Sequence, residues 1–306
     1  MDTAPLPPEP RHRLAAAWSS VHEAATGDGE GFGLVLMVVS AASVTLMAAF
    51  AKKFLPDAPQ QAVVLSRGVF LSVVFVALAR YKRAPLAGQR PGLLIGRGFL
   101  SYAALSCYFY SVQHLPLGDA VLLQYSHPVY VAAIAPWWLG ERTSRSHWGL
   151  ILLALVGVAL IVRPAGEVRA AALVGVLGSL LSAFAYMAVR GLSRTEHPMT
   201  ILAWFPLATI PPALVAVLFT GRAALPQSGR QVMGHLLVAL VAIVGQLTLT
   251  YGLTRARAAR ATAITLTGPV FGLVFGYLFF GALPTTASLV GTIVVLTTLA
   301  LLGRGR

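Results

Sequence analysis

The stretch LPLGDAVLLQYSHPVY, residues 115–130, places polar side chains and a proline inside an otherwise apolar part of the chain. Gln124 and His127 are three positions apart and therefore share one face of a helix. Pro128 has no backbone N–H, so the carbonyl group of Gln124 loses its helical partner. In lipid an unpaired carbonyl group costs several kcal/mol and must face protein, water or substrate. The stretch predicts an interrupted helix beside a polar interior.

A second copy of this pattern lies 141 residues further along, in ARAARATAITLTGPVF, residues 256–271. At that constant offset Pro128 corresponds to Pro269, and matching Tyr, Val and Gly positions extend the series on both sides. Pro269 frees the carbonyl group of Thr265, and Thr262 and Thr265 again share a helix face. A repeat of this kind indicates a duplicated architecture.

The composition is that of a polytopic membrane protein. Of the 306 residues, 57% are hydrophobic and 11% are charged, whereas soluble domains carry about 25% charged residues. The net charge of +13 comes from Lys and Arg in short segments between apolar runs. Such segments are typical of topology signals and lipid-headgroup contacts, so the charge does not indicate nucleic-acid binding.

Apolar runs and polar breaks alternate from Gly31 onward and predict an all-α membrane protein with ten transmembrane helices. Most runs approach the ~20 residues that cross ~30 Å of hydrocarbon. The expected spans are residues 32–51, 60–79, 92–113, 119–139, 146–162, 171–190, 199–219, 232–254, 259–281 and 285–303. Residues 1–31 are expected to form a disordered cytoplasmic tail. Five spans fall in each repeat, 32–163 and 171–303, and an odd number inverts the second repeat relative to the first.

Basic residues predict the orientation of these spans. If the N-terminus is cytoplasmic, fifteen of the 23 Lys and Arg lie in segments on the cytoplasmic side, six lie on the other side, and two fall within spans. Short loops rich in Lys and Arg stay in the cytoplasm. Both termini are therefore expected to be cytoplasmic, which agrees with an even number of spans.

The run RGFLSYAALSCYFYSVQHLPLGDAVLLQYSHPVYVAAIAPWWLGER, residues 97–142, resembles the third and fourth helices of EamA-domain proteins of the drug/metabolite transporter superfamily. The shared features are an arginine that opens the third helix, an aromatic-rich end, LPLGDA, a proline eight residues after that alanine, and a closing GE. The resemblance covers roughly residues 32–303. It implies a ten-helix carrier of organic metabolites with a central cavity lined mainly by helices 1, 3, 4, 6, 8 and 9.

Candidate site residues follow from the repeat and from this resemblance. The candidate substrate-binding residues are Gln124, His127, Tyr102, Tyr108, Arg97, Thr262, Thr265, Tyr186 and Gln246, with Pro128 and Pro269 as helix breaks. The alternative for the two broken helices is that the prolines are packing kinks and the hydroxyl groups bond their own helices. Tyr102 and Tyr108 are candidates to stack on a flat or amphipathic substrate, and the alternative for them is packing between helices. Tyr186 and Gln246 are candidates by position alone. An imidazole with an unperturbed pKa of about 6.5 suits a proton relay or a ligand contact, or else a neutral hydrogen bond within the bundle.

Three charged residues in or near the spans have competing interpretations. Arg67 and Arg97 lie close enough to helix ends to snorkel to opposite interfaces, which is the favoured interpretation. The alternative is that one of them, with Arg97 preferred, faces the cavity and attracts a carboxylate or phosphate. Glu141 is expected to pair with a neighbouring arginine such as Arg142 or Arg145.

The expected function is secondary transport across the inner membrane. The substrate is a small organic metabolite, an amino acid or similar compound, carried by alternating access, with export as the family's suggestion for direction. Membrane lipids and possibly protons are further expected partners. No catalytic residue, metal site or cofactor is expected, because the sequence has no HExxH, paired cysteines, Walker loop or nucleophile elbow. The alternatives are a membrane enzyme acting on a lipid-linked substrate and a membrane scaffold or sensor that transports nothing.

Overall fold

The computed structural model describes residues 29–114, 123–141, 144–162, 170–219, 226–281 and 283–304, and the elements in these ranges are all helical. They are α2 (Gly29–Phe54), α3 (Gln60–Tyr81), α4 (Pro91–His114), α6 (His127–Trp138), α7 (Arg145–Val162), α8 (Ala170–Leu192), α9 (Pro198–Leu218), α10 (Gly229–Arg255), α11 (Ala258–Ile264), η2 (Thr265–Thr267), α12 (Gly268–Phe280) and α13 (Thr286–Arg304). Each expected span overlaps one of these elements, and the ninth overlaps the series α11, η2 and α12. The LPLGDA segment and nearly all of the expected tail lie outside the described residues.

The outer surface of the bundle is suited to lipid. Six helical segments are long and apolar enough to cross a membrane, namely α2, α3, α8, α9, α10 and the run from α11 to α12. Shorter apolar helices lie within α7 and α13. Large apolar side chains point outward, including Val73 and Ile293, which are each 66% exposed. Lipid tails are as apolar as leucine side chains, so these residues need no protein partner in a bilayer.

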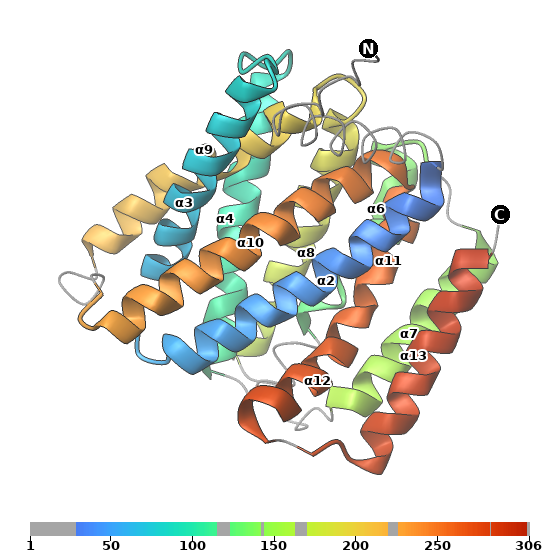
Figure 1. The fold of residues 1–306 in the computed structure, drawn as a ribbon. Helices are drawn as coiled ribbons and strands as arrows, with labels where there is room; N and C mark the ends of the chain where they lie inside the picture. Colours follow the sequence, from blue (N-terminus) through green and yellow to red (C-terminus); the bar gives the residue numbers. More distant parts are fainter. Residues whose placement is uncertain are drawn as a thin grey trace, which may run out of the picture.

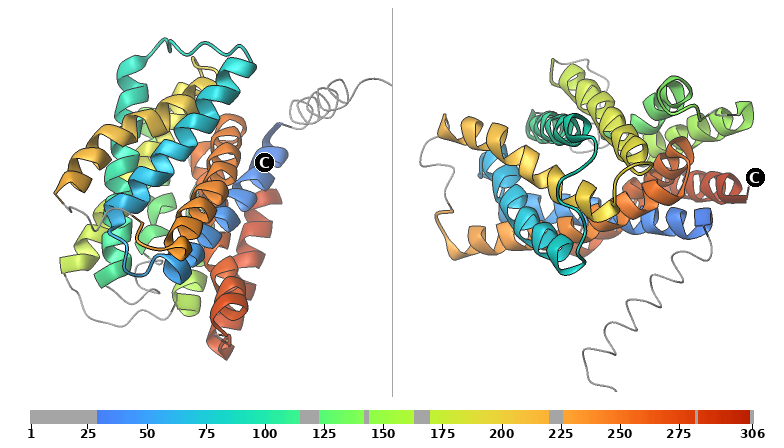
Figure 2. Two further views of the ribbon diagram at one scale, coloured as in Figure 1. Left: turned by 60° about the vertical axis from the view of Figure 1, so that its left-hand side comes forward. Right: turned by 90° about the horizontal axis from the view of Figure 1, so that it is seen from above.

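Helices of the two halves pair reciprocally. α2 packs along α10 and α4 packs along α8, so the first helix of each half lies on the third helix of the other. α3 pairs with α9, and α7 pairs with α13. Figure 1 shows α2 beside α10 in front and α7 beside α13 at one edge, and the view from above in Figure 2 keeps α13 at that edge. This exchange of partners is what a two-fold relation between the halves produces.

The fourth and ninth spans are interrupted at equivalent places. The fourth is not one helix from residue 119, because a turn at residues 125–126 precedes α6. In the ninth span the short 3₁₀ helix η2 separates α11 from α12. Pro128 and Pro269 occupy the first turns of α6 and α12, where a missing N–H removes no helical hydrogen bond. Each proline therefore begins a helical segment.

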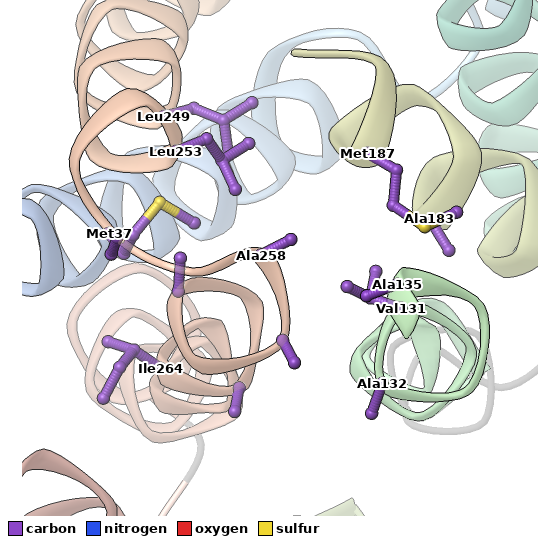
Figure 3. Packing of buried hydrophobic residues seen from close by; sticks show 14 of the residues in the cluster. Met37, Val131, Ala132, Ala135, Ala183, Met187, Leu249, Leu253, Ala258 and Ile264 are labelled. Atoms are coloured by element: carbon purple, nitrogen blue, oxygen red, sulfur yellow. The ribbon is translucent and has the colours of Figure 1, made fainter. Parts of the chain in front are cut away.

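Small side chains bring the interrupted spans close to their neighbours. Figure 3 shows Ala132 and Ala135 of α6 and Ala183 of α8 in one buried cluster with Met37 and Ala258. In lipid, helices associate mainly through close packing, which small residues permit. The cluster holds the interrupted spans of both halves against α2 and α8.

Candidate functional site

A cavity of about 70 Å³ lies between the two halves. Its polar lining residues are Arg67, Arg97, Ser101, Tyr108, Gln124, Ser182, Tyr186 and Gln246, and its apolar lining residues are Val44, Met47, Ala104, Leu105, Ala185, Phe205 and Leu249. The walls come from α2, α3, α4, α8, α9 and α10 and from the short segment that precedes α6. Both halves supply polar groups, so neither half forms this site alone.

Two buried arginines dominate the charge of the cavity. Arg67 is 4% exposed and Arg97 is 2% exposed. Their guanidinium carbons lie 5.4 Å and 4.5 Å from the centroid of the Phe205 ring, a cation–π arrangement that offsets part of the cost of burial. Arg97 also donates to the backbone carbonyl of Ile201 and to the side-chain oxygen of Gln246, each at 3.4 Å. Both arginines therefore lie inside the bundle, and the prediction that they snorkel to the membrane interfaces is wrong.

Glycines explain why these arginines face inward. At Gly68 a β-carbon would meet the hydroxyl group of Thr209 at 3.3 Å, and at Gly98 it would overlap Ala208. Because neither position has a side chain, α3 and α4 approach α9 closely. The arginine that precedes each glycine then lies beside α9 instead of facing lipid. An Arg-Gly dipeptide inside two apolar spans, residues 67–68 and 97–98, is the sequence signal for this arrangement.

Five of the predicted residues line the cavity: Arg97, Tyr108, Gln124, Tyr186 and Gln246. The side-chain amide of Gln124 donates to the hydroxyl group of Ser182 at 3.2 Å, which joins the two halves across the cavity wall. Arg67 also lines the cavity, although the sequence favoured Arg97 for that place, and Ser182 and Phe205 line it without having been predicted. A single serine or phenylalanine in an apolar helix carries no pattern that separates a lining residue from a packing residue.

His127 connects the two interruptions and is not among the residues that line the cavity. Its side chain is buried, with Nδ1 2.8 Å from the carbonyl oxygen of Gln124 and Nε2 3.1 Å from the hydroxyl oxygen of Thr265. A carbonyl oxygen only accepts, so Nδ1 carries a hydrogen. The hydroxyl group of Thr265 donates to the carbonyl oxygen of Thr262 at 2.6 Å and also lies against Nε2. The carbonyl group that Pro128 frees is thus satisfied by the imidazole. The ring also packs edge-to-face on Tyr186, with 4.9 Å between centroids, and so touches the cavity wall from behind.

Three other candidates also lie away from the cavity. Tyr102 donates to the side-chain oxygen of Gln61 at 3.3 Å. Thr262 is fully buried and donates to the carbonyl oxygen of Ala258 at 2.8 Å, a bond within its own helix. The carbonyl group of Thr265 accepts from the N–H of residue 268, so the 3₁₀ turn satisfies it without solvent. None of the described lining residues comes from the ninth span, which the family resemblance had implied as a wall.

Glu141 ties the halves together at the end of the bundle where α2 begins, called here the N-terminal end. Its carboxylate accepts from Nε of Arg190 and from the backbone N–H of Ala258 at the start of α11, both at 2.8 Å. Arg190 also donates to the carbonyl oxygens of residues 253 and 254 at the end of α10. The described ion-pair partners are Arg190 at 2.8 Å and Arg194 at 4.0 Å. They replace the expected Arg145 because the end of α6 packs beside α8; Arg142, the other expected partner, lies outside the described residues.

Replacing His127 with alanine is expected to destabilise the fold by about 1–3 kcal/mol, because the carbonyl group of Gln124 then loses its donor at 2.8 Å and keeps only the hydroxyl group of Ser179 at 3.4 Å. The measurement is the apparent Tm of the purified variant in detergent. The control is His114→Ala, since His114 is exposed. Equal Tm values for the two variants would contradict the bridging role. An unchanged pH profile of transport would remove His127 as a proton site.

Comparison with known proteins places this architecture among transporters. The pseudopaline exporter CntI of Pseudomonas aeruginosa is 28% identical over 276 residues, which cover 89% of this chain and 96% of that protein. The riboflavin transporter of Rhizobium johnstonii is 26% identical over 220 residues, covering 71% of this chain and 72% of the relative. Solute carrier family 35 member G1 of Mus musculus is 25% identical over 284 residues, which cover 87% of this chain and 76% of that protein.

A solved crystal structure shares the fold, with a TM-score of 0.75 at 18% identity, covering 89% of this chain and 97% of that one. The model of the EamA-like transporter family matches residues 31–163 and 169–304, one match in each half. The family and the relatives are transporters, which sets aside the enzyme alternative. The chain is a multi-pass membrane protein that belongs to the EamA-like transporter family.

Proposed function

We propose that the protein is a secondary transporter that moves a small organic metabolite across the inner membrane by alternating access. Ten membrane-spanning helices would form two inverted five-helix repeats, residues 32–163 and 171–303, with both termini in the cytoplasm. The observation that carries this proposal is a polar cavity lined by both halves and enclosed by reciprocally paired helices. A site shared by two repeats changes the side from which it is reached when the repeats rock against each other.

Contacts at the N-terminal end support a state that is closed on that side. Glu141 joins α6 to α8 and α11, and Arg260 of α11 pairs with Glu30 of α2 at 2.9 Å. The cavity volume of about 70 Å³ is well below the ~300–1,000 Å³ of typical small-molecule sites. A metabolite therefore enters only after the halves separate, as alternating access requires.

Export is the direction supported by the relative whose name calls it an exporter. The relatives differ in the compounds that their names mention, a pseudopaline exporter in one case and a riboflavin transporter in another. The class of substrate therefore has to be inferred from the cavity itself. If His127 exchanges protons during transport, a pH gradient across the membrane changes the rate of uptake. A comparison of uptake with and without such a gradient tests this coupling.

Counterflow in proteoliposomes tests the transport function. Vesicles containing the purified protein and loaded with an unlabelled cell extract are expected to accumulate labelled compounds from the same extract, whereas vesicles without protein do not. The assay is run with and without a pH gradient. Failure to accumulate any compound under either condition would overturn the transport proposal and favour a membrane scaffold.

A further inference from the structure

The two arginines in the cavity have no counter-charge in the described part of the chain. Four carboxylates are described, and three of them are engaged elsewhere. Glu30 pairs with Arg260, Glu141 pairs with Arg190, and Glu196 accepts from a backbone N–H at 2.6 Å. The fourth, Asp57, lies in the loop between α2 and α3. The cavity is therefore strongly cationic.

The hydrogen-bonding groups of these arginines are also incompletely used. Nε of Arg67 and Nε of Arg97 are both buried without a hydrogen-bond partner. The partners that Arg97 does have, a carbonyl and an amide oxygen at 3.4 Å, are neutral acceptors at long distance. A guanidinium group offers a planar fork of donors that matches a carboxylate. Charged side chains inside a membrane bundle are costly and mark pathways for ions or substrates.

We infer that the substrate is an organic anion, held through a carboxylate group between Arg67 and Arg97; this inference rests on the transport function proposed above. Phe205, which is 2% exposed, lies beside both guanidinium groups. Gln124 and Gln246 supply neutral hydrogen bonds around the charged region, and apolar side chains such as Met47 and Leu249 receive the carbon skeleton. Two arginines in the lining repel a cation, so compounds with a net positive charge are not expected as substrates.

The test uses the proteoliposome assay with a cell extract separated by ion exchange into anionic, neutral and cationic fractions. Mass spectrometry identifies the compounds that accumulate. Accumulation is expected from the anionic fraction, and the transported compounds should carry a carboxylate group. Arg67→Gln and Arg97→Gln are each expected to reduce that uptake by about 100-fold, the loss typical when one partner of a desolvated charge pair is removed. Arg97→Lys keeps the positive charge without the planar fork of donors. It should recover part of the uptake that Arg97→Gln loses.

The matched control is Arg80→Gln, because Arg80 lies on the same helix as Arg67 but is exposed at its end. Its uptake is expected to stay within twofold of the wild type. Accumulation from the neutral or cationic fraction alone, or of anions that carry no carboxylate, would overturn the substrate class and leave the transport function standing. Accumulation from none of the fractions would remove both. Uptake by the wild-type protein decides the class of substrate even if a variant does not fold.

Discussion

Replacing Glu141 with alanine is expected to make the cavity more accessible from the N-terminal end. A thiol on the cavity wall should be labelled from that end at least about tenfold faster than in the wild type. The substitution removes two hydrogen bonds to a carboxylate, one from Arg190 and one from the N-terminus of α11. Hydrogen bonds to charged groups contribute about 1.5–3 kcal/mol each, and every 1.4 kcal/mol changes an equilibrium about tenfold. Loss of this tie therefore favours the state that is open on that side.

Cysteine labelling measures this change. The chain has one cysteine, Cys107, so a Cys107→Ser background with Ala185→Cys carries a single thiol on the cavity wall. A membrane-impermeant thiol reagent is applied to vesicles of each orientation, and the rate of labelling is compared with and without Glu141→Ala. Glu196→Gln is the control, because Glu196 lies at the same end and bonds a backbone N–H near the start of α4. Equal labelling rates would show that Glu141 does not hold this end closed.

Gly268→Ala is expected to cost about 1–3 kcal/mol of stability through overpacking and to impair transport. A methyl group at this position would overlap the ring and hydroxyl group of Tyr125. Tyr125 is buried and its hydroxyl group bonds Thr45 at 3.0 Å, so the ring cannot move away without breaking that contact. The clash falls at the junction of the two interrupted spans, where the halves meet.

Gly272→Ala is the matched control for this substitution. Gly272 lies one turn further along α12, and a β-carbon there meets Thr45 at an ordinary 3.9 Å. Alanine favours a helix over glycine by about 1 kcal/mol, so this variant should be neutral or slightly more stable. Apparent Tm values in detergent and uptake in proteoliposomes check both variants. A Gly268→Ala protein as stable as Gly272→Ala would show that Tyr125 and α12 are loosely packed.

Some residues of the site were predicted from the sequence and others were not. The reason is that the sequence of a helix does not show how the helix is rotated about its axis in the bundle. Tyr102 and Tyr108 are six residues apart on α4, which places them about 120° apart around the helix axis. Only one of them reaches the cavity, and packing selects Tyr108. The same reason explains Arg67, whose position in an apolar span suits snorkelling until the contact of Gly68 with α9 turns that face of α3 inward.

The sequence by itself determined the membrane class, the apolar runs, the repeated prolines and the family, because these depend on local composition and on lipid as the solvent. Only the tertiary structure decided which polar groups meet. His127 contacts a threonine 138 residues away, and Glu141 pairs with an arginine 49 residues away. The convergence of Arg67 and Arg97 on Phe205 depends on how closely α3 and α4 approach α9. Such contacts arise from the packing of several helices at once, which no single stretch of sequence encodes.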